Sequence, residues 1–322
     1  MIIAFASCYK NFKSSIQGDL MKIKNDYYYE FSEIESILSK NLANRGLDKI
    51  KLNGQLKSCV TSLNQSETIV IVTGFAIKAA EIGETDGPPG ALALAYALEC
   101  LNKKVILVTD KYSEIFVRIG TNALNLDAFI YIFEENKENE QAEEIIEKFK
   151  PDHIIGIERP GRNCDNRCYS MSGEDITSIC PNTDILFIKA KEHNITTSAI
   201  GDGGNEIGMG KVMEFIHKHV YKGSLICAEL ETDNLIITGV SNWGAYGICS
   251  ALSIINNEML LIEEDLYELI LKEIVQAGAV DGCSKRCETT VDGLSYEENL
   301  NVFLNLRTIA LESIGAKLKE AN

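Results

Sequence analysis

The sequence is short of positive charge. Its 322 residues include 31 Lys and Arg against 47 Asp and Glu, which gives a formal net charge of −16. Nucleic acids and anionic membrane surfaces repel such a chain, so we expect it to bind neither. An anionic small molecule can still bind where a few arginines are gathered. The composition therefore favours a small-molecule partner.

Long hydrophobic runs are also missing. The apolar start, residues 1–7, is far shorter than the roughly 20 residues that span a bilayer, and no basic segment precedes it. We expect neither a membrane span nor a secretion signal. The ten cysteines are scattered through core-like segments, which is typical of reduced thiols in a cytoplasmic protein. Cys164/Cys168 and Cys283/Cys287 have C-x3-C spacing, whereas structural zinc prefers C-x2-C, so we interpret both pairs as coincidental.

Histidine and tryptophan are rare, with four and one copies respectively. His153, His193, His217 and His219 fall in predicted strands or helices rather than in polar loops. A Ser-His-Asp or Cys-His mechanism is therefore not expected. Trp243 stands in the polar loop of residues 239–244, where it can pack in the core or contact a substrate.

What the sequence does contain is a regular alternation of β-branched runs and amphipathic segments. We expect strands at residues 68–75, 105–110, 129–133, 153–158, 196–200, 225–230 and 235–238. Helices fill the gaps, including one beginning at Pro88, one ended by Gly278 and one behind a Ser295/Glu298 capping box. This alternation implies an α/β fold, a doubly wound three-layer αβα architecture with a mostly parallel sheet. We divide it into an N-terminal helical arm (1–46) and a single α/β catalytic domain (47–322).

The central stretch is the glycine-rich GDGGNEIGMG, residues 201–210. It follows a strand-like run and precedes a helix-like one, so N–H groups and a helix dipole would meet there and lower nearby carboxyl pKa values. It is not a Walker A loop, because its glycine spacing is one residue too long and Val212 replaces the hydroxyl residue. It is not a dinucleotide loop either, since Glu206 stands where the third glycine belongs. Asp202 and Glu206 suit an ammonium, a hard metal ion or proton transfer.

Three more polar loops should meet this one, because the loops that follow parallel strands gather at one edge of the sheet. They are residues 83–90, 157–162 and 239–244. A fourth loop, residues 279–293, follows a helix and contains two VDG repeats, and if it converges with the others their charged side chains include Glu158 and Arg286. The catalytic candidates are Asp202, Glu206, Glu84 and Asp86, and the candidate metal ligands are Asp202, Glu206 and Asp86. The candidates for substrate binding are Arg159, Arg162, Gly203, Gly204, Asn205, Ser241, Asn242, Trp243, Asp281 and Asp292.

Many of these residues can instead have a purely structural role. Glu84 and Asp86 can cap a helix, and the arginines can pair with local carboxylates. Asp281 and Asp292 stand in D-G dipeptides, which favour turns. The sequence alone does not choose between these roles and a site.

Five motifs taken together are more specific. ETDGPPGALALAYALE, IGIERPGR, GDGGNEIGMGKV, GVSNWGAYG and AVDG…TVDGL occur in this order between residues 73 and 293 and resemble the D-glutamate cyclase family. The resemblance implies a hydro-lyase that cyclises D-glutamate to 5-oxo-D-proline plus water, assisted by a divalent metal such as Mn²⁺ or Mg²⁺. The cysteines beside these motifs depart from the family pattern.

The chemistry of that reaction agrees with the residues. The ammonium must lose a proton before its nitrogen attacks, and a carboxylate can take that proton. The attacked carboxylate must be neutralised by a metal, an arginine or N–H groups. Ring closure is intramolecular, so no ATP is required. The alternatives are a non-catalytic amino-acid sensor and a phosphometabolite-binding α/β enzyme, the latter disfavoured by the acidic loops. A homo-oligomer is compatible with the sequence.

Overall fold

A six-stranded sheet forms the centre of the protein, whose computed structural model describes residues 27–320. Its strands are β1 (Thr68–Thr73), β4 (Lys104–Thr109), β5 (Phe129–Ile132), β6 (His153–Ile157), β7 (Thr196–Gly201) and β8 (Asn234–Ile237). They pair in the order β5-β4-β1-β6-β7-β8, and every pairing is parallel. The predicted doubly wound sheet is confirmed.

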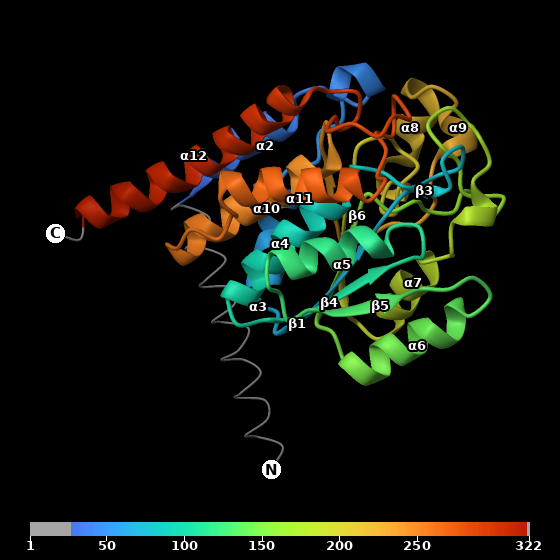
Figure 1. Cartoon of the computed structure of the whole chain (residues 1–322), viewed down its shortest axis with the longest axis horizontal. Coiled ribbons are helices and arrows are strands. Elements are labelled where there is room, and N and C mark those ends of the chain that lie inside the picture. Colours follow the sequence, from blue (N-terminus) through green and yellow to red (C-terminus); the bar gives the residue numbers. More distant parts are fainter. Residues whose placement is uncertain (1–26, 321–322) are drawn as a thin grey trace, which may run out of the picture.

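Alternate residues of each strand face two separate cores. Ile69 and Ile71 of β1 pack into one, and Val70 and Val72 into the other. Both faces are covered, which explains why the strands read as continuous apolar runs. The first face carries α3 (Gln55–Gln65), α4 (Pro88–Cys100), α5 (Glu114–Ala123), α10 (Ser241–Asn256) and α11 (Glu264–Gln276). The second carries α6 (Glu138–Phe149), α7 (Asp184–Glu192), α8 (Met213–His219) and α9 (Gly223–Ile226), which completes three layers (Figure 1).

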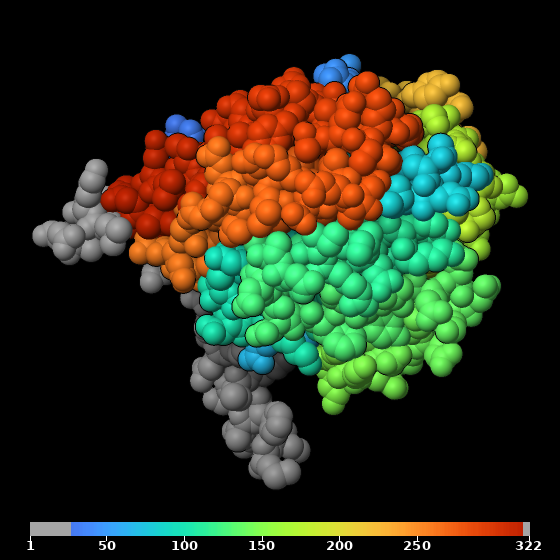
Figure 2. Space-filling view, in the orientation of Figure 1, coloured from blue at the N-terminus to red at the C-terminus, as the bar shows by residue number. Residues whose placement is uncertain are grey.

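The arm is described from residue 27 onward. Its helix α2 (Tyr28–Leu38) packs on α10 and on α12 (Tyr296–Glu320) through Phe31, Ile34 and Leu38. Figure 1 shows α12 lying along α2, and Figure 2 shows C-terminal residues covering the upper part of one face. The 3-10 helix η1 (Leu42–Arg45) then leads into the body. The predicted boundary at residue 46 stays a prediction, and residues 1–26 lie outside the described part.

Several helix ends follow the local chemistry that the sequence indicated. Pro88 and Pro89 occupy the first turn of α4, where a missing N–H costs least. Gly278, with φ of 106°, follows the end of α11. Ahead of α12, the N–H of Glu298 donates to Oγ of Ser295 at 3.2 Å, and Glu298 accepts the Ser295 N–H at 2.8 Å. The predicted capping box is confirmed.

One prediction beside the glycine-rich loop was wrong. Residues 225–230 do not form a strand, because 223–226 form α9 and the carbonyl of Leu230 instead accepts N–H groups of Gly208 and Gly210. The helix predicted after the loop is present. It begins with the 3-10 helix η3 (Gly210–Val212), which leads into the short α8.

A small antiparallel hairpin connects β1 to α4 and reverses the direction of the chain between them. It consists of β2 (Ala76–Ile77) and β3 (Ile82–Gly83). Directly after it, the N–H of Thr85 donates to the carbonyl of Val280 at 3.0 Å, which ties the loop after β3 to the segment after α11. Both segments therefore reach the point where the strand order reverses, between β1 and β6. Ligands bind at such a point in doubly wound sheets.

Candidate active site

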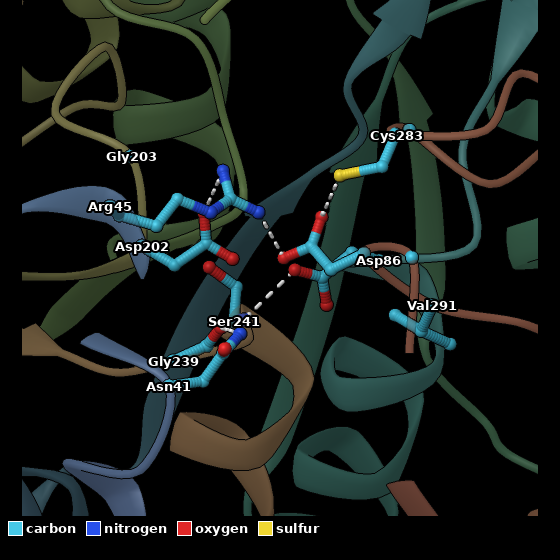
Figure 3. A network of polar contacts seen from close by, with 12 residues as sticks. Asn41, Arg45, Asp86, Asp202, Gly203, Gly239, Ser241, Cys283 and Val291 are labelled. Carbon is cyan, nitrogen blue, oxygen red and sulfur yellow. Dashed lines mark hydrogen bonds and ion pairs between the residues drawn. The ribbon is translucent and has the colours of Figure 1, made fainter. Parts of the chain in front are cut away.

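Three buried carboxylates meet beyond the carboxyl ends of β6 and β7. Asp86, Glu158 and Asp202 each offer one oxygen, and these oxygens lie within 4.8 Å of one another. We call them the acidic triad. Figure 3 shows Asp86 and Asp202 pointing toward one another, with Arg45 alongside. Three loops that are distant in sequence thus converge, as expected from the parallel sheet.

Asp86 is held by the first turn of α10. Its carboxylate accepts the backbone N–H groups of Ser241 and Asn242, each at 2.8 Å. Burial raises the pKa of Asp86 to about 7, Asp292 adds to the rise, and these two N–H groups oppose it. Asp86 is therefore tuned to a range in which a carboxyl can exchange protons near neutral pH.

Glu158 follows β6 immediately, in a left-handed conformation with φ of 45°. Non-glycine residues rarely adopt this conformation, and such strain is concentrated at functional sites. The hydroxyl of Ser241 donates to its Oε2 at 2.5 Å. Burial raises the pKa of Glu158 well above its usual range, and Glu206 and Asp86 reinforce the rise. The sequence placed Glu158 in the acidic loops but assigned it no role.

Asp202 has one paired and one unpaired oxygen. Its Oδ1 lies 3.2 Å from Nη1 of Arg45, whereas the buried Oδ2 has no hydrogen-bond partner among residues 27–320. Burial raises the pKa of Asp202 well above its usual range, and Arg45 only partly offsets this. The expected lowering by a helix dipole was wrong for Asp202, because desolvation dominates and no helix begins there. An unpaired buried oxygen is unusual and points to a ligand.

Glu206 shapes the glycine-rich loop from within. Its Oε1 accepts the N–H groups of Asp202 and Gly203 at 3.2 and 2.7 Å, and its Oε2 accepts the Gly204 N–H at 2.7 Å. These contacts place Gly203 and Gly204 around Glu206, so their N–H groups are already engaged. Metal ligation by Glu206 stays a prediction, and in the triad Glu158 stands in its place.

A cavity of about 290 Å³ opens beside the triad. Its polar lining includes Arg45, Glu84, Glu158, Asn205, Lys285 and Asp292. Asn205 donates to the carbonyl of Tyr169 at 2.7 Å, and its own buried Oδ1 has no partner in the described chain. A second groove, of about 400 Å³ between α2, η1, α3 and β8, has Glu35 as its single acidic residue, so it offers no comparable group of carboxylates.

Glu84 lies at the wall of this cavity, against Gly282. A Cβ on Gly282 would fall 1.7 Å from Oε2 of Glu84, so only glycine leaves room for the carboxylate. Burial raises the pKa of Glu84 well above its usual range, with Asp292 and Asp86 adding to the effect. Glu84 is thus a second carboxyl suited to proton transfer.

Arg45 was not identified from the sequence. It ends η1, in a helix-like arm without glycine motifs, and its Nη2 lies 2.6 Å from Oδ2 of Asp292. Since Nη1 contacts Asp202, one guanidinium joins two loops of the site. Only the folded arrangement reveals this role, because nothing near Arg45 in the sequence suggests a ligand site.

Arg159 and Arg162 lie away from the cavity lining. Arg159 is buried, with Nη1 donating to Asp110 at 2.5 Å and to the carbonyl of Gly74 at 2.8 Å. Arg162 donates through Nη2 to the carbonyl of Cys180 at 2.7 Å. Substrate binding by either arginine stays a prediction that these contacts do not support.

Three further candidates contact protein groups instead of the cavity: Asn242, Trp243 and Asp281. Asn242 accepts an N–H from the first turn of α4 at 2.7 Å, and Trp243 donates to Asn299 at 2.9 Å within the core. Asp281 accepts backbone N–H groups of its own loop. Burial acts to raise its pKa, but these N–H groups, that of Ser284 foremost, outweigh burial and lower it. Their contacts are those of positioning residues.

Residues 34–307 match the family described as D-glutamate cyclase-like, C-terminal. A protein of Homo sapiens named D-glutamate cyclase, mitochondrial, is 33% identical over 240 residues. That match covers 69% of this chain but 38% of the human protein, so the chain spans well under half of its relative's length. The matched family segment includes Arg45, the acidic triad and the cavity lining.

Proposed function

Because the chain belongs to the D-glutamate cyclase-like family, we propose that it cyclises D-glutamate to 5-oxo-D-proline and water. One observation carries the proposal: the buried acidic triad adjoins a cavity of about 290 Å³ that also presents the cation Arg45. An amino dicarboxylate needs acidic groups for its ammonium and a cation for its carboxylate. The cavity offers both.

The reaction is balanced without a co-reactant. The ammonium gives up two protons as its nitrogen forms a bond to the side-chain carboxylate carbon. One C–O bond of that carboxylate breaks, and the departing oxygen takes two protons to leave as water. Net charge does not change, so the protein has only to move protons and to neutralise the attacked carboxylate.

We assign proton movement to Glu84, and we assign Asp86 to the metal, because a bound cation would keep its carboxylate ionised. The Glu84 carboxyl is buried in the cavity lining with a raised pKa, so it can accept a proton from the ammonium and later release it. The backbone N–H groups of Gly203 and Gly204 are engaged by Glu206, so they cannot serve as an oxyanion hole. We therefore assign charge neutralisation to a cation.

The triad fits a small divalent cation. Its donors are hard carboxylate oxygens, and the unpaired Oδ2 of Asp202 supplies an open ligand position. Asp86, Glu158 and Asp202 would hold Mg²⁺ or Mn²⁺, which would polarise the attacked carboxylate. Ser241 keeps two of these ligands in position through its hydroxyl and its N–H.

The cellular setting of this activity is a matter of proposal as well. We expect a small amino acid as the partner, and not nucleic acid, because the net charge is −16. Among residues 27–320, no helix combines the length and apolar character that crossing a bilayer requires. The cytoplasmic location stays a prediction, and the human relative is named as mitochondrial.

Turnover of defined enantiomers tests the proposal. The protein is incubated with D- or L-glutamate, with Mg²⁺, with Mn²⁺ or with a chelator, and 5-oxoproline is followed by chiral chromatography. We expect lactam from D-glutamate in excess of the spontaneous reaction. Saturable binding of D-glutamate without turnover would instead identify an amino-acid sensor. Absence of both would refute the proposal.

A further inference from the structure

Arg45 is built into the site from two sides. Before it, Asn41 has φ of 69° and donates through Nδ2 to the carbonyl of Gly239 at 3.3 Å, just ahead of α10. After it, Gly46 has φ of 77°, and a Cβ there would lie 2.6 Å from the carbonyl oxygen of His219. Figure 3 shows Asn41 beside Gly239 and Arg45 reaching Asp202. These contacts fix the backbone on both sides of Arg45, so that its side chain reaches Asp202.

The guanidinium has capacity for a further anion. Nη1 contacts Asp202 and Nη2 contacts Asp292, whereas the group carries five N–H donors. The Arg45 side chain is 15% exposed and lines the cavity. An arginine guanidinium stays protonated in proteins, so Arg45 keeps its charge throughout any proton movement in the site.

The other cation of the cavity lining is less suited to this role. Lys285 is exposed and its Nζ donates to the carbonyl of Gly282 in its own loop. Lysine is also a point charge, whereas a guanidinium binds a carboxylate through two parallel hydrogen bonds. Glu84, Glu158 and Asp292 share the cavity and would repel a dicarboxylate that had no such anchor.

We propose that Arg45 binds the α-carboxylate of the substrate and thereby selects amino dicarboxylates. The inference rests on the proposed function. Of the two substrate carboxylates, the side-chain one loses an oxygen at the triad, while the α-carboxylate keeps its charge from substrate to product. A permanently charged guanidinium matches a carboxylate that never changes its charge. The N-terminal arm therefore contributes a specificity residue to the active site.

Ligand pairs that differ only in this carboxylate test the proposal. 5-Oxo-D-proline and 2-pyrrolidinone share a lactam ring, and only the former carries a carboxylate. Their affinities are measured by calorimetry or by inhibition for wild type, Arg45→Lys and Arg45→Met. We expect wild type to prefer 5-oxo-D-proline by about 10- to 100-fold, the value of a charged hydrogen-bonded contact. Arg45→Met should lose this preference while its affinity for 2-pyrrolidinone persists, and Arg45→Lys should retain part of it.

Arg118→Met is the matched control, because it removes an exposed arginine of α5 that pairs with Glu114 outside the cavity. A preference that survives in Arg45→Met would overturn the inference. Should that variant fail to fold, Arg45→Lys decides, since an undiminished preference there contradicts bidentate binding.

Turnover distinguishes a failure of this inference from a failure of the proposed function. Wild type that cyclises D-glutamate no better than 4-aminobutanoate, which lacks the α-carboxylate, refutes this inference alone. Wild type that cyclises neither refutes the proposed function.

Discussion

The hydroxyl of Ser241 lies 2.5 Å from Oε2 of Glu158, to which it donates a hydrogen bond. The backbone N–H of Ser241 donates to Asp86 at 2.8 Å. One residue at the start of α10 therefore holds two carboxylates of the acidic triad, which come from different loops. Helix α10 packs on α4 and α12, so these two helices support this arrangement.

Ser241→Ala should disturb the triad without unfolding the protein. The loss of the hydroxyl frees Glu158, so we expect affinity for Mn²⁺ and kcat each to fall about 10- to 100-fold, as for other residues that orient metal ligands. KM should change little. Ser250→Ala is the control, because Ser250 lies in the same helix and donates to the carbonyl of Leu306. Unchanged Mn²⁺ affinity in Ser241→Ala would show that the Ser241 hydroxyl does not position a metal ligand.

Asp202→Asn should separate activity from stability. Burial penalises the charged form of Asp202, and Arg45 keeps Asp292 as an ion-pair partner, so removing the charge should leave the melting temperature equal or higher. We expect kcat to fall at least about a hundredfold, because the variant loses a charged group of the reaction centre. Addition of Mg²⁺ or Mn²⁺ should raise the melting temperature of wild type and not of the variant. Turnover near that of wild type would show that the glycine-rich loop is a structural turn.

Glu206→Gln should behave differently. Three backbone N–H groups donate to the Glu206 carboxylate, and glutamine offers one acceptor oxygen in place of two. We expect unfolding free energy to fall by about 1–3 kcal/mol, the cost of leaving a buried donor unpaired. Urea denaturation measures this loss. If Glu206→Gln kept the stability of wild type but lost turnover, Glu206 would be a catalytic or metal-binding group and not a structural one.

The sequence foretold the fold because its cues are local. The β-branched runs, the Pro88–Pro89 helix start and the Ser295 capping box depend on neighbours in sequence. The loops that carry Asp86 and Asp202 also converge as expected, because parallel strands direct their following loops to one edge.

What the sequence did not foretell depends on distant contacts. Residues 225–230 are apolar enough for a strand, yet they lie over the glycine-rich loop and pair with Gly208 and Gly210. Arg159 stands in a loop that the sequence singles out, but its guanidinium donates to Asp110. Arg45 stands in a segment without a motif, and its guanidinium pairs with Asp202. The presence of an arginine in a motif therefore does not show whether its side chain lines the cavity in the folded protein.

His153 should make stability depend on pH. It is buried between the hydroxyls of Ser62 and Ser198 at 2.9 and 2.8 Å, and burial lowers its pKa to about 3. Below pH 6.5 the unfolded chain binds a proton at this residue that the folded chain does not, so stability present above pH 6.5 is lost progressively toward pH 3.

His153→Gln removes this titration. The stability advantage of wild type over the variant should shrink by about 2 kcal/mol between pH 7 and pH 5, since one proton is worth about 1.4 kcal/mol per pH unit. Urea unfolding at the two pH values measures the change. His193→Gln serves as control because His193 is exposed. An advantage that is equal at both pH values would contradict a buried neutral His153.

The most direct measurement is a time course of D-glutamate in the presence of Mn²⁺, followed by proton NMR, with wild type and Glu158→Gln side by side. Glu158 belongs to the triad and was placed there by the structure. We expect wild type to convert D-glutamate to 5-oxo-D-proline faster than it converts L-glutamate, and at least about a hundredfold faster than the variant does. Equal conversion by wild type and Glu158→Gln would contradict the triad as the reaction centre.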